Sequence, residues 1–207
     1  MLKFAGRGDF GVNQTQTQTT VTRLLEGLKG GDRDALDQLF ALLYEELKEL
    51  ARRQRRRWRG DYTLDTTALV HEAYLKLVGQ ARVDVESRAH FRALAAKAMR
   101  HILCDYARDR RTQKRGGGLE GLPLDELKPP AQVVFSEEQS DTLVALDDAL
   151  RRLERIDPRQ SEVVECRFFG GLTIEETATA IGVSPRTVKR DWAVAQAWLH
   201  REMSLRV

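Results

Sequence analysis

The side chains best suited to chemistry gather near the start of one C-terminal segment. Arg186, Lys189 and Arg190 follow closely after Ser184 and Pro185. Serine followed by proline is typical of a helix start, with serine as the N-cap and proline as the first helical residue. Helical spacing then leaves the three cations near an exposed N-terminal end. Arginine can bond a guanine edge and lysine can hold a phosphate, so the pattern favours contact with DNA.

A second short helix is expected directly before that segment. Thr173 and Glu176 form the Thr-x-x-Glu pattern of a capping box, and Gly182 permits a tight turn after the helix. Two capped helices joined by a tight turn make a helix-turn-helix, whose second helix enters the major groove. The alternative is a helical hairpin with a solvated charged face. The residues expected to contact DNA here are Ser184, Arg186, Thr187, Lys189 and Arg190.

The chain lacks the patterns that catalysis or metal binding would need. His71-Glu72 has no second histidine at HExxH spacing, and the glycines of 116–118 are not followed by Lys-Ser or Lys-Thr. Cys104 and Cys166 stand singly in apolar helical patterns, without the CxxC spacing of a zinc site. We therefore expect two buried thiols, no metal, no cofactor and no enzyme.

Charge is balanced overall but segregated along the chain. The 207 residues are 31% charged and 42% hydrophobic, with a formal net charge of +3. Residues 51–59 hold six arginines and no acid, which suits a DNA contact or a solvated helix end equally well. No apolar stretch reaches the length of about 18 residues that a membrane span needs. We expect a cytoplasmic protein.

Apolar residues recur at helical spacing and predict an all-α fold of two small helical domains joined by a linker. Residues 1–19 are rich in Gly, Gln and Thr and are expected to be a disordered extension. Residues 20–115 form the first domain. The linker spans 116–140 and contains three prolines, and residues 116–142 hold six acids. Residues 141–207 form the helix-turn-helix domain.

Three helices are expected in the first domain. One amphipathic helix spans 32–58, with Gln54 on its inner stripe. Another begins near Asp65 or Thr66, and a longer one runs from Ser87 or Arg88 to Arg115, before three glycines. Phe91 and Tyr106 lie on the apolar stripe of the last helix, where they are expected to be core side chains.

The ordered set of segments resembles a known family. Leu69-Val70-His71-Glu72, the aromatic-led basic helix 91–115, the acidic linker and the helix-turn-helix of 173–203 follow one another as in the extracytoplasmic-function (ECF) sigma factors of the bacterial sigma-70 family. The resemblance covers about 21–203. It implies a factor that binds RNA polymerase core and directs promoter-specific transcription initiation.

The resemblance also implies partners and sites. A polymerase-binding helix would meet the clamp helices of the beta-prime subunit, a basic helix would bind the displaced strand of the minus-ten element, and the helix-turn-helix would bind the minus-thirty-five element. An anti-sigma factor is a further partner that the family allows, and the free protein is expected to be a monomer. The implied polymerase contacts are Leu69, Glu72, Leu75 and Lys76, and the strand contacts are Arg100, Arg108, Arg111 and Lys114.

A stand-alone helix-turn-helix regulator that does not bind polymerase core is the alternative. It accounts for the C-terminal motif equally well. The first domain distinguishes the sigma factor hypothesis from the regulator hypothesis, because a regulator has no need of a second basic helix and a polymerase-binding face. If the linker is flexible, the two domains would be spaced on DNA without a rigid interface.

Overall fold

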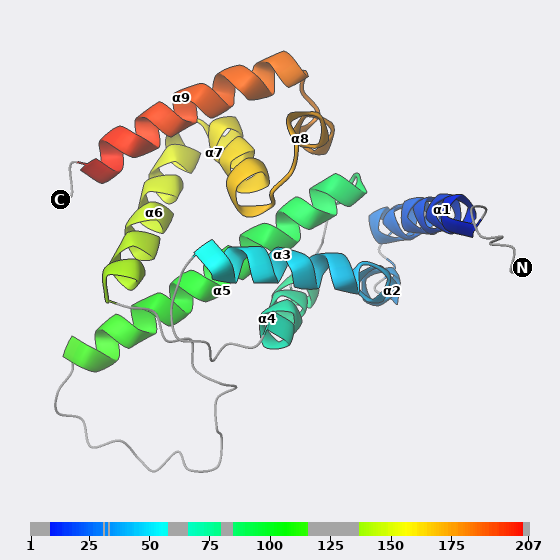
Figure 1. The fold of residues 1–207 in the computed structure, drawn as a ribbon, viewed down its shortest axis with the longest axis horizontal. Coiled ribbons are helices and arrows are strands. Elements are labelled where there is room, and N and C mark those ends of the chain that lie inside the picture. The colour runs from blue at the N-terminus through cyan, green and yellow to red at the C-terminus, as the bar shows by residue number, and fades with distance from the viewer. Residues whose placement is uncertain are drawn as a thin grey trace, which may run out of the picture.

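The computed structural model is a bundle of helices (Figure 1). It describes residues 9–30, 32, 34–57, 66–79, 85–115 and 137–204. These ranges contain no strand, which confirms the all-α class, and none of their helices is long and apolar enough to cross a membrane. In chain order the elements are α1 (Asp9–Lys29), α2 (Asp34–Leu42), α3 (Tyr44–Arg57), α4 (Thr66–Val78), α5 (Arg88–Arg115), α6 (Glu137–Ile156), α7 (Pro158–Val164), the π-helical turn η1 (Glu165–Phe169), α8 (Ile174–Ile181) and α9 (Pro185–Ser204).

Helix α1 begins well before the point at which we expected ordered structure. Its C-terminal half packs against α2 and buries an apolar stripe, from which the helix extends towards the N-terminus. The Thr20 hydroxyl donates to the Gln16 carbonyl at 2.9 Å, within the same helix. Of the residues 1–19 expected to be a disordered extension, 9–19 are helical in this structure, and residues 1–8 lie outside the described ranges. The buried stripe consists of Val21, Leu24, Leu25 and Leu28.

The single helix expected over 32–58 is divided at Leu43. The Leu43 amide still donates to the Leu39 carbonyl, and its own carbonyl accepts from Leu47, both at 3.0 Å. The chain therefore bends without losing these hydrogen bonds. The bend allows α2 to pack on α1 while α3 packs on α4 and α5.

Aromatic side chains fill the core of the first half. The Phe40 ring lies edge-on to Phe91 at 5.2 Å and to Tyr74 at 5.1 Å between ring centroids. Phe91 is fully buried, as expected from its place on the apolar stripe of α5. These contacts join α2, α4 and α5 into one packed unit.

The second half begins with α6 and turns sharply into α7. The Asp157 carboxylate accepts from the Gln160 amide at 3.1 Å, and Pro158 is the first residue of α7, which confirms the expected cap. Helix α7 continues into η1, which ends at Gly170. Helix α6 includes residues 137–140, which the sequence assigns to the linker, while 116–136 lie outside the described ranges.

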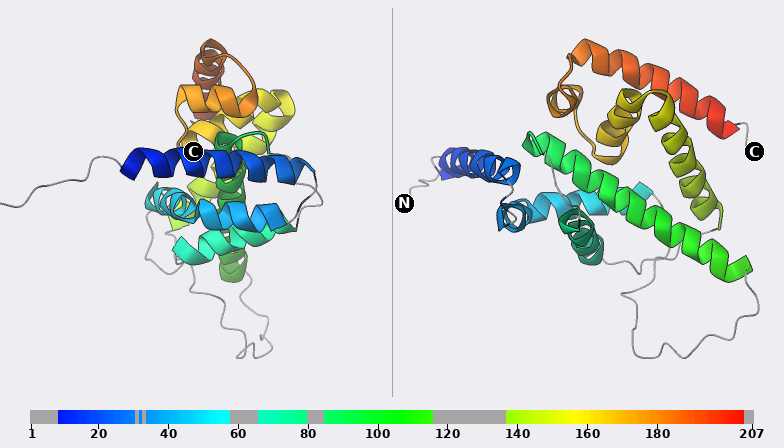
Figure 2. Two further views of the ribbon diagram at one scale, coloured as in Figure 1. Left: turned by 90° about the vertical axis from the view of Figure 1, so that its right-hand side faces the viewer. Right: turned by 180° about the vertical axis from the view of Figure 1, so that it is seen from behind.

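Helix α5 joins the two halves. The view from behind in Figure 2 shows α5 between α3 and α4 on one face and α6 and α8 on the other. One hydrophobic cluster contains Leu103 of α5, Leu146 of α6 and Phe169 of η1. The buried Gln54 amide, on the inner side of α3 as expected, donates to the Ala96 carbonyl at 3.1 Å and the Phe169 carbonyl at 3.5 Å. The two halves therefore share a core, and the spacing without a rigid interface that we expected does not describe this conformation.

Candidate nucleic-acid interface

The start of α9 is positioned by the capped helix before it. The Thr173 amide donates to the Glu176 carboxylate at 2.8 Å, and the Glu176 amide donates to the Thr173 hydroxyl at 3.0 Å. This reciprocal pair is the expected capping box of α8. Gly182 then adopts a φ of 68°, a left-handed conformation that suits glycine, and the chain enters α9 within a few residues.

A small apolar cluster fixes the angle between α8 and α9. Val188 of α9 is fully buried against Ala178 of α8 and Val163 of α7, with Val183 and Trp192 packed around them. The small Ala178 side chain allows the two helices to approach closely. The inward residues of α9 are therefore those expected from helical spacing, and the opposite face is directed outwards.

The first turn of α9 exposes cations beside a serine cap. The Ser184 hydroxyl accepts from the Thr187 amide at 3.1 Å and lies 2.8 Å from the Thr187 hydroxyl. Arg186 and Lys189 are exposed. Helix N-termini carry partial positive charge and unpaired amides, so these cations add to a site that already favours anions.

Arg190 has a partner within the protein. Its guanidinium donates to the buried Asp191 carboxylate at 3.1 Å, and Arg159 of α7 donates to the same carboxylate at 2.6 Å. Burial alone would raise the pKa of Asp191, but the hydrogen bonds from Arg159 and Arg190 outweigh it and lower that pKa. The Arg190 side chain is 66% exposed, and Arg159 also satisfies the carboxylate, so Arg190 can turn to an external anion at small cost.

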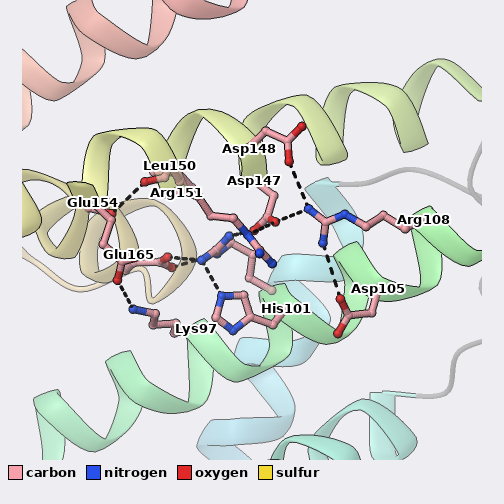
Figure 3. A network of polar contacts seen from close by, with 12 residues as sticks. Lys97, His101, Asp105, Arg108, Asp147, Asp148, Leu150, Arg151, Glu154 and Glu165 are labelled. Carbon is pink, nitrogen blue, oxygen red and sulfur yellow. Dashed lines mark hydrogen bonds and ion pairs between the residues drawn. The ribbon is translucent and has the colours of Figure 1, made fainter. Parts of the chain in front are cut away.

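The basic helix α5 is arranged differently from the expectation. Arg100, expected to contact DNA, is only 3% exposed and is bonded to Asp147 of α6 and Glu165 of η1. Figure 3 shows the polar network to which these two carboxylates belong. Arg100 Nη2 and Nε lie 2.5 and 3.2 Å from the two Glu165 oxygens. In this conformation Arg100 is inside the molecule and cannot reach a phosphate.

Two titratable groups beside Arg100 respond to burial. Burial raises the pKa of Glu165, and the guanidinium of Arg100 opposes that rise. Burial, together with the charge of Arg100, lowers the pKa of His101 to about 3. The neutral His101 ring can therefore accept a hydrogen bond, and its Nε2 lies 2.9 Å from Arg100 Nη2.

Arg108 extends the same contact towards solvent. Its Nη2 lies 2.6 Å from Asp147 and 3.3 Å from Asp148. The side chain is 30% exposed, so it is less enclosed than Arg100. The side chains of Arg111 and Lys114, the other expected strand contacts, lie outside the described part of the structure.

Two further pairs between α5 and the second half were not expected from the sequence. Lys97 Nζ lies 3.0 Å from Glu154 of α6, and Arg92 Nη1 lies 3.3 Å from Glu176 of α8.

The sequence carries one signal for the buried ion pair of Arg100, because Asp147 stands among the apolar residues of α6. A carboxylate in an apolar stripe predicts a buried cationic partner, although it does not identify that partner.

The expected polymerase-binding helix α4 has one buried and several exposed members. Leu69 is fully buried, so it supports the helix from inside and cannot itself contact a partner in this conformation. Glu72 accepts from the Tyr106 hydroxyl at 2.7 Å, and Lys76 pairs with Asp105 at 3.4 Å. Leu75 is 53% exposed, so its side chain is available to a partner.

Burial and the hydrogen bond to Glu72 raise the pKa of Tyr106 to about 12. The tyrosine therefore stays a donor at neutral pH. Its ring is partly buried against the core, as expected for a core side chain. This bond fixes the carboxylate of Glu72 against α5.

The arginine run makes contacts within the molecule. Arg52 and Arg56 both pair with Glu49, at 3.4 and 2.9 Å. Arg53 faces Gly171 of the second half, where a Cβ on the glycine would meet the guanidinium at 2.9 Å. The run therefore helps to join the halves, and the choice between a DNA contact and a solvated helix end stays open for its outer members.

Both cysteines are buried free thiols, as expected. Burial raises the pKa of Cys104 to about 11 and that of Cys166 to about 12, so both stay protonated and unreactive at neutral pH. Within the described residues, no group of His, Cys, Asp and Glu could hold a metal ion.

Comparison with known proteins matches both halves of the molecule. The family model described as "ECF sigma factor" matches residues 18–205. Two curated proteins named RNA polymerase sigma-E factor, from Streptomyces antibioticus and Streptomyces avermitilis, are each 38% identical over 92 residues, which is 44% of this chain and 49% of theirs. The chain thus spans about half the length of these relatives, and no solved structure gives a significant match. Because the family match runs from α1 through α9, the chain belongs to the ECF sigma factor family.

Proposed function

We propose that the protein is a sigma factor that acts in the cytoplasm, binds RNA polymerase core and directs it to specific promoters. The observation that carries this proposal is the family match through both halves of the chain. A DNA-binding motif alone would match only the C-terminal part. The geometry adds an exposed cationic helix start in the second half and an exposed leucine on α4 in the first.

The second half would bind the minus-thirty-five element as a helix-turn-helix. Helix α9 would enter the major groove with its N-terminal part, where Arg186 and Lys189 are exposed and Ser184 caps the helix. Arg186 is suited to a guanine edge and Lys189 to a phosphate. Arg190 would also contact DNA once its guanidinium releases Asp191, because Arg159 still donates to that carboxylate.

The first half would bind the clamp helices of the beta-prime subunit through the outer face of α4. Leu75 is the apolar contact, and the half-exposed Lys76 lies beside it. Glu72 is held by Tyr106 and is a positioned acceptor at the edge of the same face. Leu69 anchors this helix to the core below.

A stand-alone regulator would need the α9 face but not the α4 face. The deciding experiment is therefore binding of the full chain to purified core RNA polymerase, compared between Leu75→Asp and Leu42→Asp. Leu42 is the matched control, because it is also an exposed leucine, at 39%, but lies on α2. We expect Leu75→Asp to weaken core binding at least about tenfold, as for a hot-spot residue, and Leu42→Asp to leave it unchanged.

A third variant separates polymerase binding from DNA binding. Arg186→Ala with Lys189→Ala should keep the affinity for core and lose promoter-directed transcription, at about 1–3 kcal/mol for each lost base or phosphate contact. No binding of the wild-type chain to core, together with sequence-specific DNA binding by the chain alone, would establish the stand-alone regulator instead.

A further inference from the structure

Two exposed arginines, one on α7 and one on α9, share a single buried carboxylate. Asp191 is 2% exposed, yet its Oδ2 accepts from Arg159 Nε at 2.6 Å and its Oδ1 accepts from Arg190 Nε at 3.1 Å. The side chains of Arg159 and Arg190 are 45% and 66% exposed. Within the described residues, no other carboxylate forms an ion pair with either arginine. Each oxygen of Asp191 therefore serves an arginine from a different helix, and these two helices lie side by side (Figure 1).

Packing between α7 and α9 does not require this carboxylate. Val163 of α7 and Val188 of α9 are fully buried in one apolar cluster, which already joins the two helices. Burying an anion costs free energy that an apolar side chain of similar size does not cost. An anion close to a surface that binds phosphates also weakens that binding. The burial of Asp191 at this place therefore indicates a role in controlling its two arginines.

The two arginines differ in their place relative to DNA. Arg190 follows Arg186 by four residues, so these two share one side of α9, whereas Arg159 is the second residue of α7. Arg190 lies 3.1 Å from the same Asp191 oxygen through both Nε and Nη2, so it must release that oxygen to form a two-donor bond with DNA. With Arg190 as the sole partner, this release would leave a buried, unpaired anion, which is strongly unfavourable. Arg159 removes that obstacle, because it keeps a charge-assisted hydrogen bond to the other oxygen.

We propose that Arg159 is a positioning residue, which makes Arg190 available to DNA by holding the Asp191 carboxylate in its place. This inference rests on the proposed function, because that function brings α9 into contact with DNA. Arg159 acts through Asp191 and Arg190 and needs no contact with DNA of its own. Loss of Arg159 should therefore lock Arg190 onto Asp191 and weaken DNA binding.

The test measures duplex binding by variants of the full chain. Wild-type protein first selects its preferred site from a pool of short duplexes with a randomised centre, and the most enriched duplex, labelled with fluorescein, is the probe. Fluorescence anisotropy at fixed salt gives the dissociation constant, because phosphate contacts depend on salt. The variants are Arg159→Ala, Asp191→Asn and the combination of both. The matched control is Arg155→Ala, which removes an exposed arginine from the end of α6, close to Arg159 in the sequence.

We expect Arg159→Ala to bind the probe about tenfold more weakly than Arg155→Ala, as for the loss of one arginine contact with DNA. Asp191→Asn should bind at least as tightly as wild-type protein, because neutral asparagine does not hold Arg190 by charge. In the Asp191→Asn background, Arg159→Ala should cause no further loss. Arg190→Ala should be as weak as Arg159→Ala, and combining these two should weaken binding no further.

A loss that persists in the Asp191→Asn background would overturn the inference, because Arg159 would then contact DNA directly. Equal affinities of Arg159→Ala and Arg155→Ala would also overturn it, as would failure of wild-type protein to enrich any duplex. Circular dichroism confirms that every protein compared is folded. If Arg159→Ala does not fold, Arg159→Gln replaces it. Glutamine keeps a neutral donor to Asp191, so its loss should be smaller and should again vanish in the Asp191→Asn background.

Core polymerase binding by the wild-type chain reports on the proposed function independently. If wild-type protein binds core and the loss caused by Arg159→Ala persists in the Asp191→Asn background, the inference fails and the proposed function stands. If wild-type protein selects a duplex without binding core, and Asp191→Asn abolishes that loss, the proposed function fails and the inference holds for a chain that binds DNA alone.

Discussion

Three arginines share one carboxylate inside this protein. Asp147 is fully buried and accepts hydrogen bonds from Arg100, Arg108 and Arg151. In a low-dielectric setting, each of these charges is stable only while the others are present. Loss of the central anion, Asp147, should therefore destabilise the cluster far more than loss of a peripheral anion.

Replacing Asp147 with alanine should destabilise the protein strongly. We expect Asp147→Ala to lower the free energy of unfolding by about 3–5 kcal/mol, because it leaves Arg100 buried with fewer compensating charges. Asp148→Ala is the control, since Asp148 lies next in sequence but is 42% exposed, and should cost no more than about 1 kcal/mol. Urea denaturation measures both. Equal decreases in the free energy of unfolding of the two variants would show that burial does not increase the contribution of Asp147 to stability.

His101 predicts how stability changes with pH. Burial and the cations Arg100, Lys76, Lys97 and Arg151 lower its folded-state pKa from 6.5 to about 3. Below pH 6.5 His101 is protonated in the unfolded chain but stays neutral in the folded protein. The free energy of unfolding should therefore fall as the pH falls from about 6.5.

Urea denaturation at several pH values between 7.5 and 5 tests this expectation, in a range above the titration of ordinary carboxylates. His101→Gln can still accept a bond from Arg100 but does not titrate, so its stability should change less over the same range. A wild-type slope equal to that of His101→Gln would contradict the assignment.

At the scale of elements, local signals in the sequence were reliable. Thr173 with Glu176, Asp157 with Pro158, and Gly182 each fixed a helix end that the structure contains. These signals depend on neighbours within a few residues, and so the sequence alone is sufficient to predict them. The sequence does not predict the bend at Leu43, because the apolar spacing continues through it. The bend is required only by packing, since α2 contacts α1 while α3 contacts α4 and α5.

Gly182 gives a prediction for the turn before α9. Its φ of 68° would strain any residue with a Cβ, and no atom lies within 4 Å of that Cβ. Gly182→Ala should therefore cost about 1 kcal/mol from backbone strain alone. Gly182→Asn should cost less, because asparagine tolerates this conformation better. Thermal unfolding compares the two. A larger loss for asparagine than for alanine would mean that steric contact, and not strain, governs the position.

Contacts between segments that lie far apart in the sequence could not be predicted from local patterns. Arg100 was expected at the surface because α5 is basic near its end, and nothing local connects it with Glu165, 65 positions away. Likewise, Leu69 stands in the segment that resembles a polymerase-binding motif, yet it faces the core. A motif identifies a helix, whereas the face that each residue occupies depends on which helices cover it.

At the scale of the whole molecule, the shared core makes the two halves one unit in this conformation. Leu103 of α5 and Leu146 of α6 belong to the same buried cluster, and the ion pairs of Arg100 and Arg108 with Asp147 add polar contacts beside it. A protein that contacts two separate promoter elements, as we propose for this chain, would then need a conformational change on binding its partners. The free energy for that change must come from contacts that only the changed conformation can make.

Cooperative unfolding follows from this shared core. In differential scanning calorimetry, we expect a single transition with a ratio of calorimetric to van't Hoff enthalpy of about 1. Asp147→Ala should weaken the coupling and broaden or divide the transition. Two separate transitions in the wild-type protein would mean that the halves are independent before unfolding.

Transcription in vitro is the direct test of the proposal that this chain brings RNA polymerase to promoters. Cognate core polymerase would be incubated with genomic DNA, with and without the protein, and the 5′ ends of the transcripts mapped. We expect new transcripts that begin at a limited set of sites in the presence of the protein, and that disappear with Arg186→Ala and Lys189→Ala. Identical transcripts with and without the protein, at concentrations that saturate core, would contradict it.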